Sequence, residues 1–149
     1  MHTTVTFNRS LPLFGINDKG LKTYFDASSE LLGPGGSAAS PMDTVLESLG
    51  ACSIMDIISI LKKMRRELIF MEADLDAQRA KEHPKVFTAI QISYRLKSPD
   101  CTHADFEKAV RLSMDNYCSV AAMIRGAGCV ITWSTELVAV KSDVTERSA

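Results

Sequence analysis

The segment SPMDTVLESLGACSIMDIISILKKMRR, residues 40–66, predicts one long helix on which the fold depends. Ser40 suits the N-cap, Pro41 the first helical position, and Asp43 the first turn, where a carboxylate meets the positive helix end. Basic residues within 62–66 match the negative end. Because apolar side chains surround most of this helix, we expect it to be central and buried on several sides.

The remaining segments predict strands and two shorter helices around this helix. Glycine, serine and alanine between it and the first strands favour a loop over residues 31–40. The alternating pattern IQISYRL is typical of a strand with one face on a core. The order predicts an α+β fold with one domain over residues 1–141 and a polar tail over 142–149. The expected strands are 3–9, 20–27, 69–81, 86–97 and 129–140, with turns around 15–18 and 82–84, and the expected helices are 102–117 and 119–128.

Composition excludes several function classes. With 149 residues, 46% hydrophobic and 23% charged, the chain is that of an ordinary globular protein. A formal net charge of −1 gives no reason to expect nucleic acid or an anionic membrane as partner. The sequence has no run of 18 apolar residues and no apolar signal core, so we expect a cytoplasmic protein with no membrane association. Its cysteines should therefore be mostly reduced.

Cofactor and metal motifs are not recognisable in the sequence. It has no CxxC, HExxH, Walker loop or GxGxxG, so no cofactor is predicted. The three histidines, His2, His83 and His103, are scattered without metal-ligand spacing, and no metal site is predicted from them. The cysteines are therefore the remaining candidates for catalytic residues.

Cys52 lies in the middle of the predicted helix, on a polar stripe with Ser48, Asp56 and Ser59 at intervals of three to four residues. Burial and the nearby Asp56 carboxylate both disfavour a thiolate there. Polar groups inside an apolar helix are nevertheless costly unless they are satisfied, and such stripes often line a site. Cys52 is therefore a candidate site residue as well as a candidate core residue.

Cys118 follows one predicted helix and begins the next. Its sulfur can lie near unpaired backbone N–H groups, which should favour the thiolate and lower the pKa. Cys129 opens a strand and is expected to be a small buried hydrophobe, and Cys101 is expected at the surface or in a helix cap.

Two segments resemble a known family. SPMDTVLESLGACSIMDIISILKK is similar to the central-helix signature of the OsmC/Ohr proteins, with a cysteine eleven residues after the proline. NYCSVAAMI resembles the second signature, and Cys52 and Cys118 are 66 positions apart, as fits that family. The order of elements agrees over nearly the entire chain.

The resemblance implies antiparallel sheets around a long central helix in an intertwined homodimer. It also implies reduction of organic hydroperoxides through two cysteines. Cys52 would attack the peroxide and become a sulfenic acid, Cys118 would resolve it as a disulfide, and a dithiol would restore both thiols.

One position departs from the family pattern. The well-characterised peroxidases of this family have a glutamate directly after the helix-start proline, which orients an arginine that activates the first cysteine. Met42 stands at this position here, so the chain resembles a divergent branch of the family. The region from which the arginine would come offers Lys19, with Arg9 a few residues earlier. A lysine supplies charge without the bidentate geometry of a guanidinium. Met42, Ser48 and Asp56 are the expected pocket residues.

Three functions remain open from the sequence. The protein could be a thiol peroxidase of the OsmC/Ohr type, or a non-catalytic redox sensor or apolar-ligand binder that keeps both thiols. It could also retain only the fold, with cysteines of structural use.

The apolar side chains that surround most of the central helix predict self-association. A chain of 149 residues cannot cover all of its apolar faces, and Gly50 and Ala51 would admit another backbone. We expect a homodimer with a large apolar interface. Sedimentation should show a dimer at micromolar concentration, and a folded monomer there would contradict the prediction.

Overall fold

The structure is a computed structural model that describes residues 1–27 and 34–140. The chain divides into two compact units, Met1–Glu47 and Ser48 onward. The start of the predicted 31–40 loop and the predicted 142–149 tail lie outside the described residues. The elements are β1 (Thr3–Thr6), β2 (Leu13–Asn17), β3 (Lys22–Phe25), α1 (Pro41–Lys63), β4 (Phe70–Arg79), β5 (Phe87–Ser98), α2 (His103–Leu112), the π-helix η1 (Ser113–Tyr117), α3 (Ser119–Gly126) and β6 (Val130–Ala139).

The first unit contains an antiparallel sheet in the order β1–β2–β3. The predicted turn around residues 15–18 is wrong, because Gly15 and Ile16 lie within β2. The reversal comes directly after it, where the Asn17 carboxamide oxygen accepts from the N–H groups of Lys19 and Leu21 and Gly20 has a φ of 76°. Glycine also occurs inside strands, so this residue type alone does not separate a strand from a turn.

Helix α1 begins as the sequence predicts. The Asp43 N–H donates to Ser40 Oγ at 3.2 Å, and the Ser40 N–H donates back to the Asp43 carboxylate at 3.1 Å. The helix is long and apolar enough to cross a membrane, but the core helix of a soluble protein passes the same test. Ile57 and Leu61 are completely buried on one stripe of the helix, whereas Met55 is 65% exposed, so the expected burial on several sides is not found in the single chain.

The second unit is built on a sheet in the order β4–β5–β6. β4 and β5 are antiparallel, whereas β5 and β6 run parallel. The expectation of purely antiparallel sheets therefore holds for the first unit and not for this one. A parallel pair needs a crossover connection, which α2, η1 and α3 supply.

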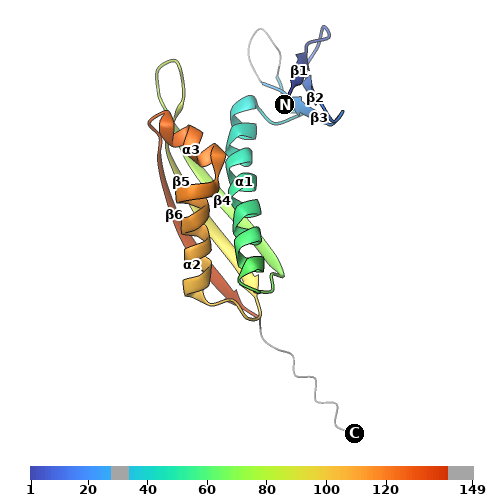
Figure 1. The fold of residues 1–149 in the computed structure, drawn as a ribbon. Coiled ribbons are helices and arrows are strands. Elements are labelled where there is room, and N and C mark those ends of the chain that lie inside the picture. The colour runs from blue at the N-terminus through green and yellow to red at the C-terminus, as the bar shows by residue number, and fades with distance from the viewer. Residues whose placement is uncertain (28–33, 141–149) are drawn as a thin grey trace. The chain divides into compact units, whose positions relative to one another are not determined.

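The helices cover one face of this sheet (Figure 1). Alternate side chains of β5 point into the core beneath them, and Ile90, Ile92, Tyr94 and Leu96 are at most 1% exposed. Gly50 of α1 packs against Leu75 of β4, and a Cβ at position 50 would lie 3.0 Å from a Leu75 methyl group. The close approach at Gly50 thus comes from the chain's own sheet.

Candidate functional site

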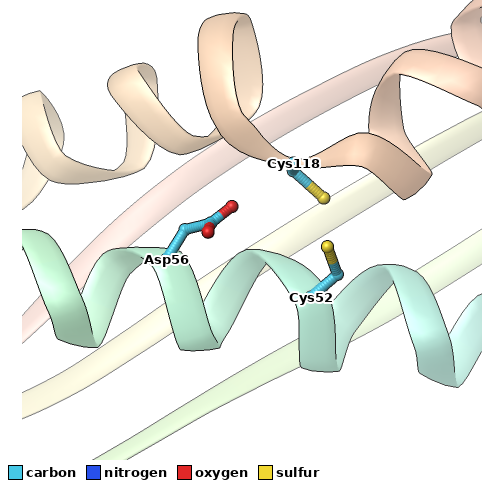
Figure 2. A group of neighbouring side chains, drawn as sticks. All are labelled: Cys52, Asp56 and Cys118. Carbon is cyan, nitrogen blue, oxygen red and sulfur yellow. The ribbon is translucent and has the colours of Figure 1, made fainter.

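Two thiols and one carboxylate converge between α1 and the start of α3 (Figure 2). Cys52 and Asp56 come from successive turns of α1, and Cys118 comes from the junction of η1 and α3. The two sulfur atoms and a carboxylate oxygen of Asp56 all lie within 4.8 Å of one another. The structure thus places the two cysteines side by side, whereas their catalytic roles stay a prediction.

Cys118 is the N-cap of α3, and its sulfur accepts from the Ala121 N–H at 3.4 Å. The expected contact with a helix N-terminus is present, but the expected lowering of its pKa is wrong. Burial raises the pKa of the Cys118 thiol to about 11, and the Ala121 N–H offsets this only in part. The adjacent Cys52 and Asp56 raise it further. The side chain is only 3% exposed, so desolvation outweighs the helix end.

A chain of buried polar groups ties these elements together. The Tyr94 hydroxyl on β5 is 2.8 Å from Ser53 Oγ on α1, and Ser53 Oγ is in turn 2.9 Å from the Gly50 carbonyl oxygen, to which it donates. Ser113 in η1 is 3.2 Å from the Asp56 carboxylate and 3.3 Å from the Ser53 carbonyl oxygen. Burial raises the pKa of Tyr94 to about 12, so its hydroxyl stays protonated and able to donate.

A hollow of about 300 Å³ opens beside Cys118. Its lining includes Tyr117 and Ser119 on either side of the cysteine, and Arg125 of α3. The Arg125 guanidinium donates to the Met114 carbonyl, which joins α3 to η1. A positive charge therefore lies in the same hollow as the buried thiol.

The other expected site residues lie elsewhere along the chain. Ser48 is exposed on α1, and Met42 is half-buried in its first turn. Lys19 lies in the exposed turn after β2. Arg9 has a φ of 63° and lines a hollow of about 410 Å³ in the first unit, together with Asp26 and Ser37.

The remaining cysteines are separate from this cluster. Cys129 is 5% exposed, which confirms the prediction that it is a small buried residue. Cys101 is half-buried at the start of α2, next to the N-cap Thr102. Both are free thiols, as are Cys52 and Cys118.

Sequence reasoning missed four residues around the cluster: Ser53, Tyr94, Ser113 and Arg125. Tyr94 could have been found, because in the pattern IQISYRL it occupies the core-facing register beside isoleucine and leucine. A buried hydroxyl at such a position needs a partner. No comparable pattern marks Ser113, which depends on how η1 docks against α1.

Comparison with known proteins agrees with this architecture. The family model described as OsmC-like protein matches residues 33–134. Protein YhfA of Escherichia coli K12 is 36% identical over 139 residues, which cover 93% of this chain and 99% of YhfA. The chain belongs to the OsmC-like family.

Solved structures support the same fold. A hypothetical protein from Aquifex aeolicus VF5 superposes with a TM-score of 0.75 and 27% identity, covering 92% of this chain and 96% of that one. An organic hydroperoxide resistance protein OsmC from Legionella pneumophila superposes with a TM-score of 0.64 and 17% identity, covering 91% and 95%. The second likeness shows the fold alone.

The closeness of the two sulfur atoms predicts a specific disulfide. Mild oxidation should link Cys52 to Cys118, because only a small approach is needed to reach the sulfur–sulfur bond length of about 2.05 Å. Mass spectrometry of a non-reducing digest should find this linked peptide pair. Cys101→Ser should leave it unchanged as a control, and a predominant link through Cys101 or Cys129 would contradict the geometry.

Proposed function

We propose that this protein is a two-cysteine peroxidase that reduces organic hydroperoxides at the expense of a dithiol. The observation that supports it most directly is the placement of Cys52 and Cys118, whose sulfur atoms lie within 4.8 Å of each other. Membership of the OsmC-like family supports the same chemistry, since relatives such as the Legionella protein carry hydroperoxide resistance in their names.

The proposed reduction of a hydroperoxide takes three steps. The Cys52 thiolate attacks one peroxide oxygen, which breaks the O–O bond, forms a sulfenic acid and, with one proton, releases an alcohol. The Cys118 thiol then attacks the Cys52 sulfur, and water leaves as the disulfide forms. An external dithiol reduces the disulfide by exchange and leaves as its own disulfide.

Burial favours Cys52 as the attacking thiol. Cys52 is half-buried, whereas Cys118 is 3% exposed. A bulky hydroperoxide therefore reaches Cys52 more easily, and Cys118 is suited to attack a neighbour that is already bonded within the protein. Asp56, whose carboxylate lies within 4.8 Å of both sulfur atoms, is proposed as a pocket residue.

We further propose that the protein works as a cytoplasmic homodimer. Val45 and Met55 of α1 are 39% and 65% exposed in the single chain, and a second chain could cover them. The pocket would then be completed by groups from both chains.

A redox sensor is the second candidate function. Within residues 1–27 and 34–140 no ion pair joins Asp56 to a basic side chain, so the carboxylate beside Cys52 is not neutralised there. Such a site would favour slow, stoichiometric oxidation over turnover. Repeated turnover separates a peroxidase from a sensor.

The turnover test uses cumene hydroperoxide with a dithiol in excess. The parent protein should consume many equivalents of peroxide, and Cys52→Ser should lower the rate by about 10³-fold or more, because the nucleophile is lost. Cys118→Ser should consume about one equivalent and then stop if the dithiol cannot reach the sulfenic acid. Cys101→Ser is the matched control. A parent that stops after one equivalent would favour the sensor.

We propose Lys19 or Arg9, of the same chain or of the second chain of the dimer, as the source of a positive charge that activates Cys52. Removing the true partner in Lys19→Met or Arg9→Met should slow alkylation of Cys52 by iodoacetamide at pH 7 by about tenfold, because a nearby cation favours the reactive thiolate. Lys81→Met is the control for the loss of one surface charge. Should neither substitution change the rate, the assignment is wrong.

A further inference from the structure

The cluster of Cys52, Asp56 and Cys118 has the composition of a metal site. Each residue offers one ligand atom, and these three atoms lie within 4.8 Å of one another. In a tetrahedral zinc site, with Zn–S about 2.3 Å and Zn–O about 2.0–2.2 Å, neighbouring ligand atoms are about 3.5–3.8 Å apart. A small contraction of the three side chains would therefore enclose an ion.

The charges at the cluster also favour a cation. Two thiolates and a carboxylate would bring three negative charges together between two packed elements, and such charges need compensation when they are taken out of water. In the part of the chain that the structure describes, the ion pairs found all lie elsewhere, and the Arg125 guanidinium in the hollow beside Cys118 donates to the Met114 carbonyl, not to a ligand of the cluster. A divalent metal ion would supply that compensation.

Neighbouring groups already orient two of the three ligands. The Ser113 hydroxyl lies 3.2 Å from one Asp56 oxygen, and the Ala121 N–H donates to the Cys118 sulfur. Contacts of this kind fix the direction of ligand side chains in metal sites, and they leave lone pairs for the ion.

The ligand set discriminates among metals. Thiolates select zinc or copper(I) over magnesium and calcium, which prefer oxygen ligands. The carboxylate oxygen then favours zinc, which accepts Asp together with Cys, over copper(I), for which soft sulfur ligands are the selective ones.

We propose that the reduced protein binds one Zn²⁺ per chain through Cys52, Asp56 and Cys118, with a fourth position left to water. This proposal uses the cysteines of the proposed peroxidase and does not require that activity. The two uses exclude each other, because a disulfide removes both thiolate ligands. A hydroperoxide would take two electrons from the two thiolates and two protons from the buffered solution, giving the disulfide, an alcohol, one water and free Zn²⁺.

The test uses Co²⁺ as a spectroscopic probe, added anaerobically to tag-free, full-length, reduced protein. We expect thiolate-to-cobalt charge-transfer absorption and the visible bands of four-coordinate Co²⁺. Both should saturate at one ion per chain and disappear when Zn²⁺ displaces the probe. Absence of the charge-transfer band in the parent protein would overturn the proposal.

Variants identify the ligands. Cys52→Ser and Cys118→Ser should each weaken Co²⁺ binding by at least about tenfold and reduce the charge-transfer intensity, since one sulfur is lost. Asp56→Asn should weaken binding but keep the charge transfer of both sulfurs. Cys101→Ser should bind as the parent does. Equal binding by the Cys52→Ser, Cys118→Ser double variant would overturn the assignment.

A measurement without substitutions guards against variants that misfold. The parent protein, oxidised until Cys52 and Cys118 are linked, should bind no Co²⁺ and should recover one site on reduction. Retention of the site in the disulfide form would contradict the proposal. The Co²⁺ test does not depend on peroxide turnover, and the turnover test does not depend on Co²⁺ binding. Failure of the zinc proposal is therefore distinguishable from failure of the peroxidase proposal.

Discussion

The docking of η1 on α1 is the constraint on which the site depends. Ser113 lies fully buried within hydrogen-bonding distance of both the Ser53 carbonyl oxygen and the Asp56 carboxylate. The Ser113 hydroxyl thereby links the π-helical turn to α1 at the Ser53 carbonyl oxygen and the half-buried Asp56 carboxylate. Cys118 follows that turn directly, and its distance from Cys52 is therefore set by a contact five residues earlier. A π-helical turn at this point agrees with the frequent occurrence of such turns at functional sites.

Burial and the N-terminus of α3 act in opposite directions on the pKa of the Cys118 thiol. The end of α3 offers Cys118 an N–H group, but the surrounding core and the adjacent Asp56 outweigh it, so the pKa of that thiol is raised. A buried, protonated thiol is protected from adventitious oxidation, and it reacts mainly with a group held next to it inside the protein, such as the oxidised sulfur of Cys52. In this unit the packing therefore positions the thiols, and activation has to come from a cation that compensates for Asp56.

The sequence predicts the central helix because its signals are local. The Ser40–Asp43 cap and the basic C-terminal turn depend only on neighbours along the chain, and both appear as expected. The first sheet was mispredicted where a local signal was ambiguous, since Gly15 in β2 suits a strand as well as a turn. The parallel pairing of β5 with β6 carries no signal within either strand and follows only from the crossover between them.

For the site, the pairing of Cys52 with Cys118 followed from a family resemblance, and no property of the two residues themselves would have produced it. The direction of the Cys118 pKa was missed because the depth of burial depends on packing from α1 and β5. Ser113 and Arg125 were missed for the same reason, as their partners lie on other elements.

Asp56 is the residue on which the two proposed uses of the site differ. For a peroxidase, the Asp56 carboxylate lies within 4.8 Å of both sulfur atoms and adds to the raised pKa of the Cys118 thiol. For a metal site the same carboxylate is a ligand, and the ion that it helps to hold also stabilises both thiolates. A bound Zn²⁺ would thus resolve the electrostatic conflict that the thiols face alone. It would also occupy the sulfur lone pairs that attack peroxide, so the ion would compete with oxidation for the same electrons. The acidic side chain of Asp56 beside two thiols is therefore unfavourable for a peroxidase and required for a zinc site.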